Sequence, residues 1–187
     1  MSIHINSLMT DKGENWKKPF IFLATGFGLG WSPIASGTVG TIPGIFIVLA
    51  LTSLQLGWQI LIAALLVLVA IPICDLAEKH FRIKDDYRIV ADEFLTFPIC
   101  MLGLPPEARV LGIAFLTNRL MDVLKPPPAR SLQKLPGGIG ITIDDTVSSL
   151  YSLLLNHMLY WFIWGAGSNL IIAVNKAASA FLSAHSI

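Results

Sequence analysis

The sequence predicts an all-α, multi-helix integral membrane protein, and three observations support this fold class. Hydrophobic residues make up 54% of the chain and charged residues only 13%, which is too apolar for an ordinary soluble domain. Residues 19–74 contain no Asp, Glu, Lys, Arg or His, and Lys176 is the only Asp, Glu, Lys or Arg after Asp145. Apolar runs of this length are typical of membrane spans.

The N-terminal 18 residues are polar and mixed in charge, and we interpret residues 1–18 as a cytoplasmic tail. Residues 19–187 would then form a single membrane-embedded helical domain. Trp16 beside Lys17 and Lys18 suits contact with lipid head groups, although a plain disordered tail explains the pattern equally well. A secretory signal peptide does not fit, because glycines break the apolar run that follows.

The apolar segments pair into three predicted helical hairpins. Their arms are residues 42–55 with 58–74, 94–104 with 110–123, and 146–164 with 169–182. The first arm is only about 22 Å long, so it must tilt or span a ~30 Å hydrocarbon core incompletely. Residues 75–88 are expected to be a surface loop or a helix extension, and residues 125–145 an irregular connection rich in proline and glycine.

The charged residues orient these hairpins. Lys and Arg concentrate in residues 1–18, 75–93 and 124–145, and Arg109 is the only one at the opposite turns. Because positive charge favours the cytoplasmic side, we expect a cytoplasm-facing site on the charged loops. A formal net charge of +1 gives no support for nucleic-acid binding.

Five carboxylates lie at the charged ends of three apolar segments. Asp92 and Glu93 are adjacent, Asp122 follows later in the chain, and Asp144 and Asp145 form a second pair. Carboxylates brought together repel one another unless a cation neutralises them, and a hard divalent cation such as Mg²⁺ prefers oxygen ligands. The alternative for a single pair is helix capping, since acids favour a helix N-terminus.

Cations accompany this acidic group. Arg119, Asp122 and Lys125 are spaced at i, i+3 and i+6, so they share one helical face until Pro126 ends the helix. An acid between two cations suits metal or phosphate handling. A structural ion-pair ladder explains the same spacing.

A glycine-rich stretch covers residues 26–40, with five glycines that exclude a regular helix throughout. Exposed backbone amides, with the hydroxyls of Ser36 and Thr38 at the start of the next helix, would form an anion site for phosphate. The alternative is that the glycines permit close helix packing in a membrane.

Four ordered motifs resemble those of the phosphatidylglycerophosphatase A family. They are Gly26 to Gly40 with Ser32-Pro33 and Gly37-Thr38, the Asp92-Glu93-Phe94 triplet, Arg119 with Asp122-x-x-Lys125-Pro126-x-Pro128-x-Arg130, and Gly137-Gly138-x-Gly140-Ile141-x-x-Asp144-Asp145. The resemblance covers roughly residues 20–165. It implies an all-helical, Mg²⁺-dependent phosphatase, multi-pass in the bacterial cytoplasmic (inner) membrane, that converts the phospholipid phosphatidylglycerol phosphate to phosphatidylglycerol. Residues 19–187 would be the phosphatase domain.

The resemblance suggests roles for individual residues. The metal would be held by Asp92, Glu93, Asp122, Asp144 and Asp145, and Lys125 would complete the catalytic set. The substrate phosphate would be bound by Gly37, Thr38, Arg119, Lys125, Arg130, Gly137 and Gly138. Asn118, Ala91, Thr142 and Ser148-Ser149 depart from the expected pattern without removing a charged group.

Two other readings compete with this one. A membrane transporter or a non-catalytic ion-binding scaffold could use the same carboxylates, but transporter acids tend to lie at mid-membrane whereas these lie at segment ends. A histidine-dependent phosphatase is disfavoured, because His4, His80, His157 and His185 lie outside every motif. The oligomeric state is left open by the sequence.

Overall fold

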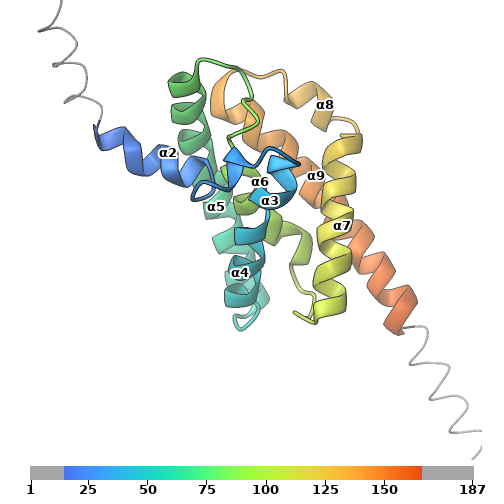
Figure 1. Ribbon diagram of the computed structural model, residues 1–187. Coiled ribbons are helices and arrows are strands. Elements are labelled where there is room, and N and C mark those ends of the chain that lie inside the picture. Colours follow the sequence, from blue (N-terminus) through green and yellow to red (C-terminus); the bar gives the residue numbers. More distant parts are fainter. Residues whose placement is uncertain (1–14, 166–187) are drawn as a thin grey trace, which may run out of the picture.

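The computed structural model describes residues 15–165, and this part of the chain is entirely helical (Figure 1). The elements are η1 (Asn15–Lys17), α2 (Lys18–Ala24), η2 (Leu29–Trp31), α3 (Ser36–Gly40), α4 (Ile42–Leu51), α5 (Leu56–Phe81), α6 (Ala91–Thr96), η3 (Phe97–Met101), α7 (Ala108–Leu124), α8 (Ala129–Leu132), α9 (Gly137–Tyr160) and the π-helical turn η4 (Trp161–Gly165). No strand occurs among these residues, so the prediction of an all-α fold is confirmed for them.

The short pair α6 and η3 lies at the centre of the molecule. It contacts α4, α5, α7 and α9, and every residue from Phe94 to Met101 is buried. The helix tightens to a 3₁₀ turn at Phe97 because Pro98 has no amide hydrogen to donate. Residues 94–104 were predicted to form one arm of a hairpin. That prediction is wrong in its packing, because Phe94 to Met101 are a buried core around which longer helices assemble.

The predicted first hairpin exists as two helices joined by a short turn. Its arms do not pack chiefly on each other, since α4 packs against α6 and η3 while α5 packs against α9, α6 and α2. α5 continues beyond Cys74 to Phe81 and includes Pro72, so residues 75–81 extend the helix rather than forming a loop.

The second half of the chain contains one clear correction. α7 ends at Leu124, before Pro126 as predicted, but α9 already begins at Gly137, directly after Pro136. Residues 137–145 were expected to be irregular and are the first turns of a 24-residue helix. Asp144 and Asp145 therefore lie beyond the first turn, which excludes the helix-capping alternative for them. The arm predicted at 169–182 lies outside the described residues.

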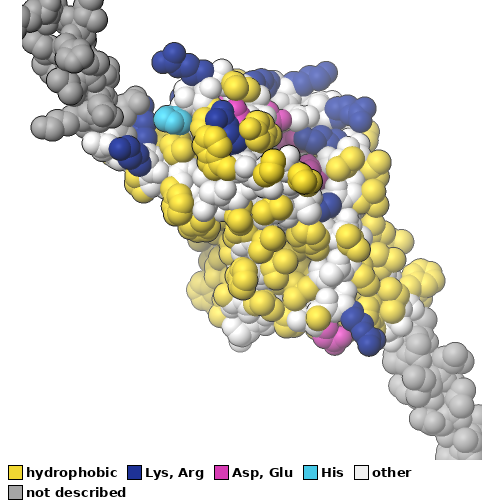
Figure 2. All heavy atoms as spheres, in the orientation of Figure 1, with side chains coloured by type: hydrophobic (Ala, Val, Ile, Leu, Met, Phe, Trp, Pro, Cys, Tyr) yellow, Lys and Arg dark blue, Asp and Glu magenta, His cyan; other side chains and the backbone are white. Residues whose placement is uncertain are grey.

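Charge and hydrophobicity separate along the molecule. Figure 2 shows cationic and acidic side chains gathered at the end near α8, and hydrophobic side chains covering most of the surface below it. Large apolar side chains such as Leu65, Leu68, Phe46 and Leu154 are exposed on three of the helices. Among the described helices, α5 is the one that is long and apolar enough to cross a membrane.

Candidate active site

The acidic pair opens α6, at the centre of the fold. Asp92 and Glu93 occupy the first turn of this helix, where carboxylates interact favourably with the helix dipole. Asp92 is 6% exposed. Its Oδ1 atom is buried and has no hydrogen-bond partner among the described residues. A buried carboxyl oxygen without a hydrogen-bond partner is costly, so this atom points to a ligand.

Arg119 links α7 to the acidic pair. Its Nη1 atom donates a hydrogen bond of 2.6 Å to Glu93 Oε2, and its Nη2 atom donates to Asp122 Oδ2 one helical turn away. The Nε atom of the same guanidinium is buried without a partner within residues 15–165. Arg119 thus joins two carboxylates and keeps one N–H available for a further acceptor.

Lys125 links the end of α7 to α9. It follows the last residue of the helix in a left-handed conformation, with φ of 45°. Its Nζ atom lies 2.6 Å from Asp144 Oδ2 and 4.0 Å from Asp122 Oδ1. Asp144 Oδ1 is buried and unpaired within the described structure, as is Asp92 Oδ1. Asp145 is also buried and forms no hydrogen bond or close ion pair with a described residue, so Arg119 and Lys125 act on its charge only from a greater distance.

These carboxylates influence one another. Burial raises the pKa of Asp92 well above its usual range, and the neighbouring charge of Glu93 adds to the effect. Burial raises the pKa of Glu93 to about 7 although Arg119 opposes it, and raises the pKa of Asp144 to about 6 although Lys125 opposes it. The pKa of Asp145 is raised by burial and then by Asp122 and Asp92. Five carboxylates thus share one electrostatic environment with only two cations.

Gly37 lies directly against this centre. A Cβ atom at this position would lie 2.3 Å from Glu93 Oε1 and 2.7 Å from Arg119 Nη1, so a side chain is excluded there. Thr41, one turn further along, donates from its hydroxyl to Glu93 Oε2 at 3.1 Å. Thr41 was not predicted to be a site residue. The sequence does indicate it, because a spacing of four residues from Gly37 places both on the same helical face.

Other glycines of the stretch serve packing. A Cβ atom on Gly30 would lie 2.1 Å from the carbonyl oxygen of Arg88, and one on Gly40 would lie 2.4 Å from Val90 Cβ. These contacts hold residues 26–40 against the segment that leads into α6, as the packing alternative predicted. Thr38 is exposed. Its hydroxyl forms no hydrogen bond with a described residue, and within this segment Gly37 is the residue that lies against the carboxylates.

Gly137 and Gly138 lie against α5. A Cβ atom on Gly138 would lie 1.9 Å from the carbonyl oxygen of Ile71, and the Gly138 amide donates to Asp75 Oδ1 at 3.4 Å. A Cβ atom on Gly137 would meet the same Asp75 carboxylate at 2.3 Å. The structure explains both glycines by close helix packing. Arg130, on α8, is exposed and forms no ion pair within residues 15–165.

Gly138→Ala is expected to destabilise the protein by at least ~1–3 kcal/mol, because the added methyl group meets backbone rather than a movable side chain. The melting temperature of the purified protein in detergent measures this effect. Gly112→Ala is the control, since a Cβ atom there meets nothing within 4 Å and alanine favours a helix. Equal melting temperatures for the two variants would contradict the packing role of Gly138.

Two of the departures from the family pattern contact each other. Asn118 directly precedes Arg119 on α7, and Ser149 lies on α9. The Ser149 hydroxyl lies 3.0 Å from Asn118 Oδ1, and both side chains are buried. Each polar side chain therefore satisfies the other. The two histidines of the described residues lie elsewhere: His157 Nε2 is 2.9 Å from the carbonyl oxygen of Leu102, and the His80 ring packs beside Phe81.

The donor set suits a hard cation, although it is not preassembled around one. Within the described residues, no three His, Cys, Asp or Glu side chains form a group arranged to hold a metal ion. Arg119 and Lys125 occupy oxygens of three of the carboxylates. The unpaired oxygens of Asp92 and Asp144 are oxygen ligands of the kind that Mg²⁺ takes together with water and a substrate phosphate.

This all-helical fold gathers five carboxylates, three buried and two partly buried, with an arginine and a lysine, and these are the groups that helical proteins acting on phosphate esters require. Comparison with known proteins makes the class specific. The family model described as Phosphatidylglycerophosphatase A matches residues 22–160. The chain belongs to the phosphatidylglycerophosphatase A family, and it is an enzyme of the phosphatase class.

Individual relatives support this assignment. The chain is 34% identical over 138 residues to Phosphatidylglycerophosphatase A of Escherichia coli, covering 72% of this chain and 79% of that protein. It is 33% identical over 150 residues to Phosphatidylglycerophosphatase A of Haemophilus influenzae, covering 78% and 91%. It is 33% identical over 152 residues to a putative phosphatidylinositol-3-phosphatase of Bacteroides thetaiotaomicron, covering 76% and 94%. No solved structure matches the chain significantly.

Proposed function

We propose that the chain is a Mg²⁺-dependent lipid phosphomonoesterase that hydrolyses phosphatidylglycerophosphate to phosphatidylglycerol and inorganic phosphate at a membrane surface. The observation that carries this proposal is the centre of five carboxylates, three of them buried, and two cations in a chain of the phosphatidylglycerophosphatase A family. The relatives named for phosphatidylglycerophosphate support this head group in preference to a phosphoinositide.

The residues divide into two groups in this proposal. Asp92, Glu93, Asp122, Asp144 and Asp145 would hold Mg²⁺, with the unpaired oxygens of Asp92 and Asp144 the most available. When bound, the ion neutralises the carboxylates and polarises the phosphoryl oxygens. One carboxylate takes a proton from the attacking water, which forms a bond to phosphorus while the bond to the glycerol oxygen breaks. That oxygen leaves with a proton as the hydroxyl of phosphatidylglycerol.

The cations would stabilise the charge that develops on the phosphoryl group. Arg119 contributes its unpaired Nε–H, and Lys125 contributes the N–H groups that Asp144 does not occupy. Gly37 leaves the space beside Glu93 and Arg119 free of a side chain. Thr38 and Arg130, which lie at the surface, are proposed to contact the phosphate as it enters.

Lys125→Ala is expected to raise KM and to lower kcat together. A phosphate clamp binds ground state and transition state alike, and the change also leaves Asp144 without its cation. Initial-rate kinetics on phosphatidylglycerophosphate measure both constants. Lys79→Ala is the control, because it removes a lysine paired with an aspartate at the same distance of 2.6 Å outside the centre. Equal kinetic effects in the two variants would contradict the role of Lys125.

We further propose that the chain is a multi-pass protein of the bacterial cytoplasmic membrane, with the centre on the cytoplasmic side. Support comes from the exposed apolar surface, from the span-length helix α5 and from the lysines and arginines gathered at one end (Figure 2). Lys84→Cys and Lys134→Cys are expected to resist impermeant thiol reagents in intact cells, whereas Glu107→Cys is labelled. The native Cys74 and Cys100 are both buried, so background labelling is low. The reverse labelling pattern would invert this topology.

The substrate is tested by phosphate release from a panel of lipid phosphomonoesters. The purified protein with Mg²⁺ is expected to act on phosphatidylglycerophosphate with a higher kcat/KM than on phosphatidylinositol 3-phosphate or phosphatidic acid. A higher kcat/KM on phosphatidylinositol 3-phosphate would assign the chain to the activity in the name of its Bacteroides relative. No turnover of any of these lipids would favour the transporter or ion-binding alternative.

A further inference from the structure

The short helix α2 packs on α5 near the point where the exposed surface of α5 changes from apolar to charged. The side chains of Leu61, Leu65 and Leu68 are exposed on the apolar part of α5, and charged residues begin at Asp75. α2 packs on α5 and carries exposed aromatic side chains, among them Phe20 and Phe22. Aromatic residues and lysines at such a boundary are typical of the head-group layer of a bilayer.

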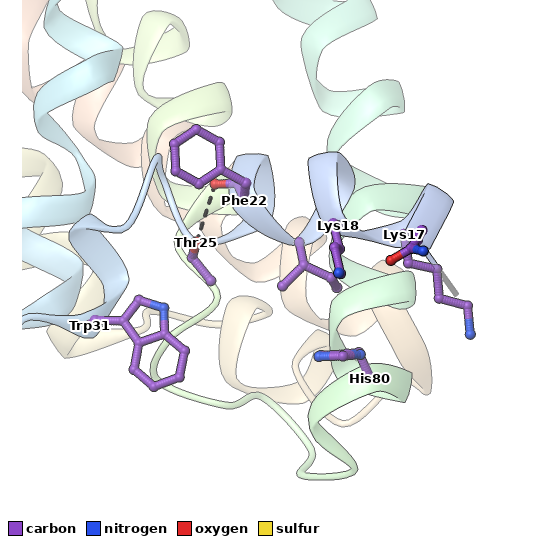
Figure 3. A pocket seen from close by; sticks show the side chains of 8 residues that line it. Lys17, Lys18, Phe22, Thr25, Trp31 and His80 are labelled. Atoms are coloured by element: carbon purple, nitrogen blue, oxygen red, sulfur yellow. Dashed lines mark hydrogen bonds between the residues drawn. The ribbon is translucent and has the colours of Figure 1, made fainter. Parts of the chain in front are cut away.

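A cationic cavity of about 410 Å³ lies on one side of α2. Lys17, Lys18 and His80 line it together with Asn15, Thr25 and Trp31, and no carboxylate of the described residues is among its lining residues. Figure 3 shows Lys18 from α2 and His80 from α5 directed toward the same space, with the indole of Trp31 across from them. A hollow lined by basic side chains suits an anionic guest.

The indole of Trp31 is held in place by its own contacts. The guanidinium of Arg88 lies 5.0 Å from the centre of this ring, and Phe81 meets it edge-on at 6.3 Å. Arg88 is itself committed to Asp86 at 2.7 Å, so it is not the cation that this cavity offers. Trp31 therefore forms one wall of the cationic cavity, and contacts with Arg88 and Phe81 orient its ring.

An apolar cavity of about 420 Å³ lies on the other side of α2. It is lined by Trp16, Phe20, Leu65, Leu68, Val69, Pro72, Ile73 and Leu76, none of which is charged. Leu76 and His80 are one turn apart on α5, and Trp16 and Lys17 are adjacent, so the two cavities approach each other at the start of α2. A polar cationic hollow beside an apolar one matches the two halves of a phospholipid.

We propose that these two cavities bind one anionic phospholipid of the bilayer, with its phosphodiester head group beside Lys18 and His80 and an acyl chain between Phe20 and Leu68. None of the lining residues belongs to the carboxylate centre, so the site is separate from the proposed catalytic one. It does not depend on the proposed activity, because the head group is retained and no bond is broken.

Native mass spectrometry of the full chain in neutral detergent tests this site. Phosphatidylserine and phosphatidylcholine with the same acyl chains are titrated separately, and neither carries a phosphomonoester. The wild-type protein is expected to bind phosphatidylserine more tightly. Lys18→Glu should weaken phosphatidylserine binding by at least ~10-fold, since a charge-assisted contact becomes a repulsion. Lys84→Glu, the same reversal at an exposed lysine outside both cavities, should leave the affinity unchanged.

The acyl half has its own matched pair. Leu68→Ser should lower the affinity for both lipids, whereas Leu154→Ser should lower neither, because these leucines are 62% and 64% exposed and only Leu68 lines the apolar cavity. His80→Ala should act in the same direction as Lys18→Glu and replaces it if that variant does not fold. Equal effects of Lys18→Glu and Lys84→Glu, or no preference for phosphatidylserine in the wild-type protein, would overturn the proposal. Displacement of the lipid by millimolar glycerol 3-phosphate would also overturn it, because the site would then be one for soluble phosphates.

Discussion

Replacing Asp92 with asparagine is expected to lower kcat on phosphatidylglycerophosphate by more than ~10²-fold, because a ligand to the metal stabilises the transition state by several kcal/mol. Asp92 is buried at the start of α6 with an unpaired Oδ1 atom. The amide is isosteric, so the packing around it is retained while the charge is lost. Asp122→Asn is expected to act in the same direction, since Asp122 faces both Arg119 and Lys125. Steady-state kinetics of the purified variants measure the loss.

Glu107→Gln is the matched control for this change. Glu107 is exposed and precedes the first turn of α7, whereas Asp122 lies near the other end of that helix, so its replacement should leave kcat within about threefold of the wild-type value. His157→Ala should also remain active. A folded Asp92→Asn variant that keeps more than a tenth of the wild-type kcat would remove Asp92 from the proposed catalytic set. A folded but inactive His157→Ala variant would point to a histidine mechanism.

Removing divalent cations is expected to abolish turnover, the second large effect. Five carboxylates share the centre, and among the described residues Arg119 and Lys125 are the cations paired with them, so the proposed mechanism requires additional positive charge. Phosphate release is followed after incubation with EDTA and again after excess Mg²⁺ is added. Far-UV circular dichroism in EDTA controls for unfolding. Undiminished turnover in chelator would show that the carboxylates act without a metal.

The charged residues of the centre could be predicted from the sequence because charge is rare in this chain. Asp92, Glu93 and Arg119 stand out beside apolar runs, and Arg119 does contact Glu93 across 26 positions of sequence. The end of α7 could also be predicted, because Pro126 cannot continue a helix and disfavours a helical conformation in the residue before it. Short-range chemistry of this kind is local and therefore visible in a single sequence.

The start of α9 could not be predicted, because local propensity and tertiary packing disagree there. Glycine disfavours a helix, and residues 137–140 contain three glycines. In the folded protein Gly138 lets α9 approach the Ile71 carbonyl of α5 more closely than any side chain would permit. The contact between distant helices outweighs the local preference. The same reason applies to residues 26–40, whose glycines were predicted to form an anion site for phosphate. Gly30 and Gly40 of this stretch instead pack on the segment before α6.

The pairing inside the centre was also beyond the sequence. Arg119 and Lys125 were expected to be available for phosphate, and each already contacts two carboxylates. Thr41 reaches Glu93 from a different helix, 52 positions away in the chain. Such contacts depend on how α4, α6, α7 and α9 are placed around the buried core, and a single sequence carries no direct record of that placement.

The central claim, that the buried carboxylates form a Mg²⁺ site, is tested most directly by electron paramagnetic resonance of Mn²⁺, an ion that prefers the same oxygen ligands. The purified chain is titrated with Mn²⁺, and the free ion is measured for the wild-type protein, Asp92→Asn and Glu107→Gln. We predict saturable binding that Mg²⁺ displaces, retained in Glu107→Gln and weakened at least ~10-fold in Asp92→Asn. Mn²⁺ binding that is absent from the wild-type protein, or unchanged in Asp92→Asn, would contradict the claim.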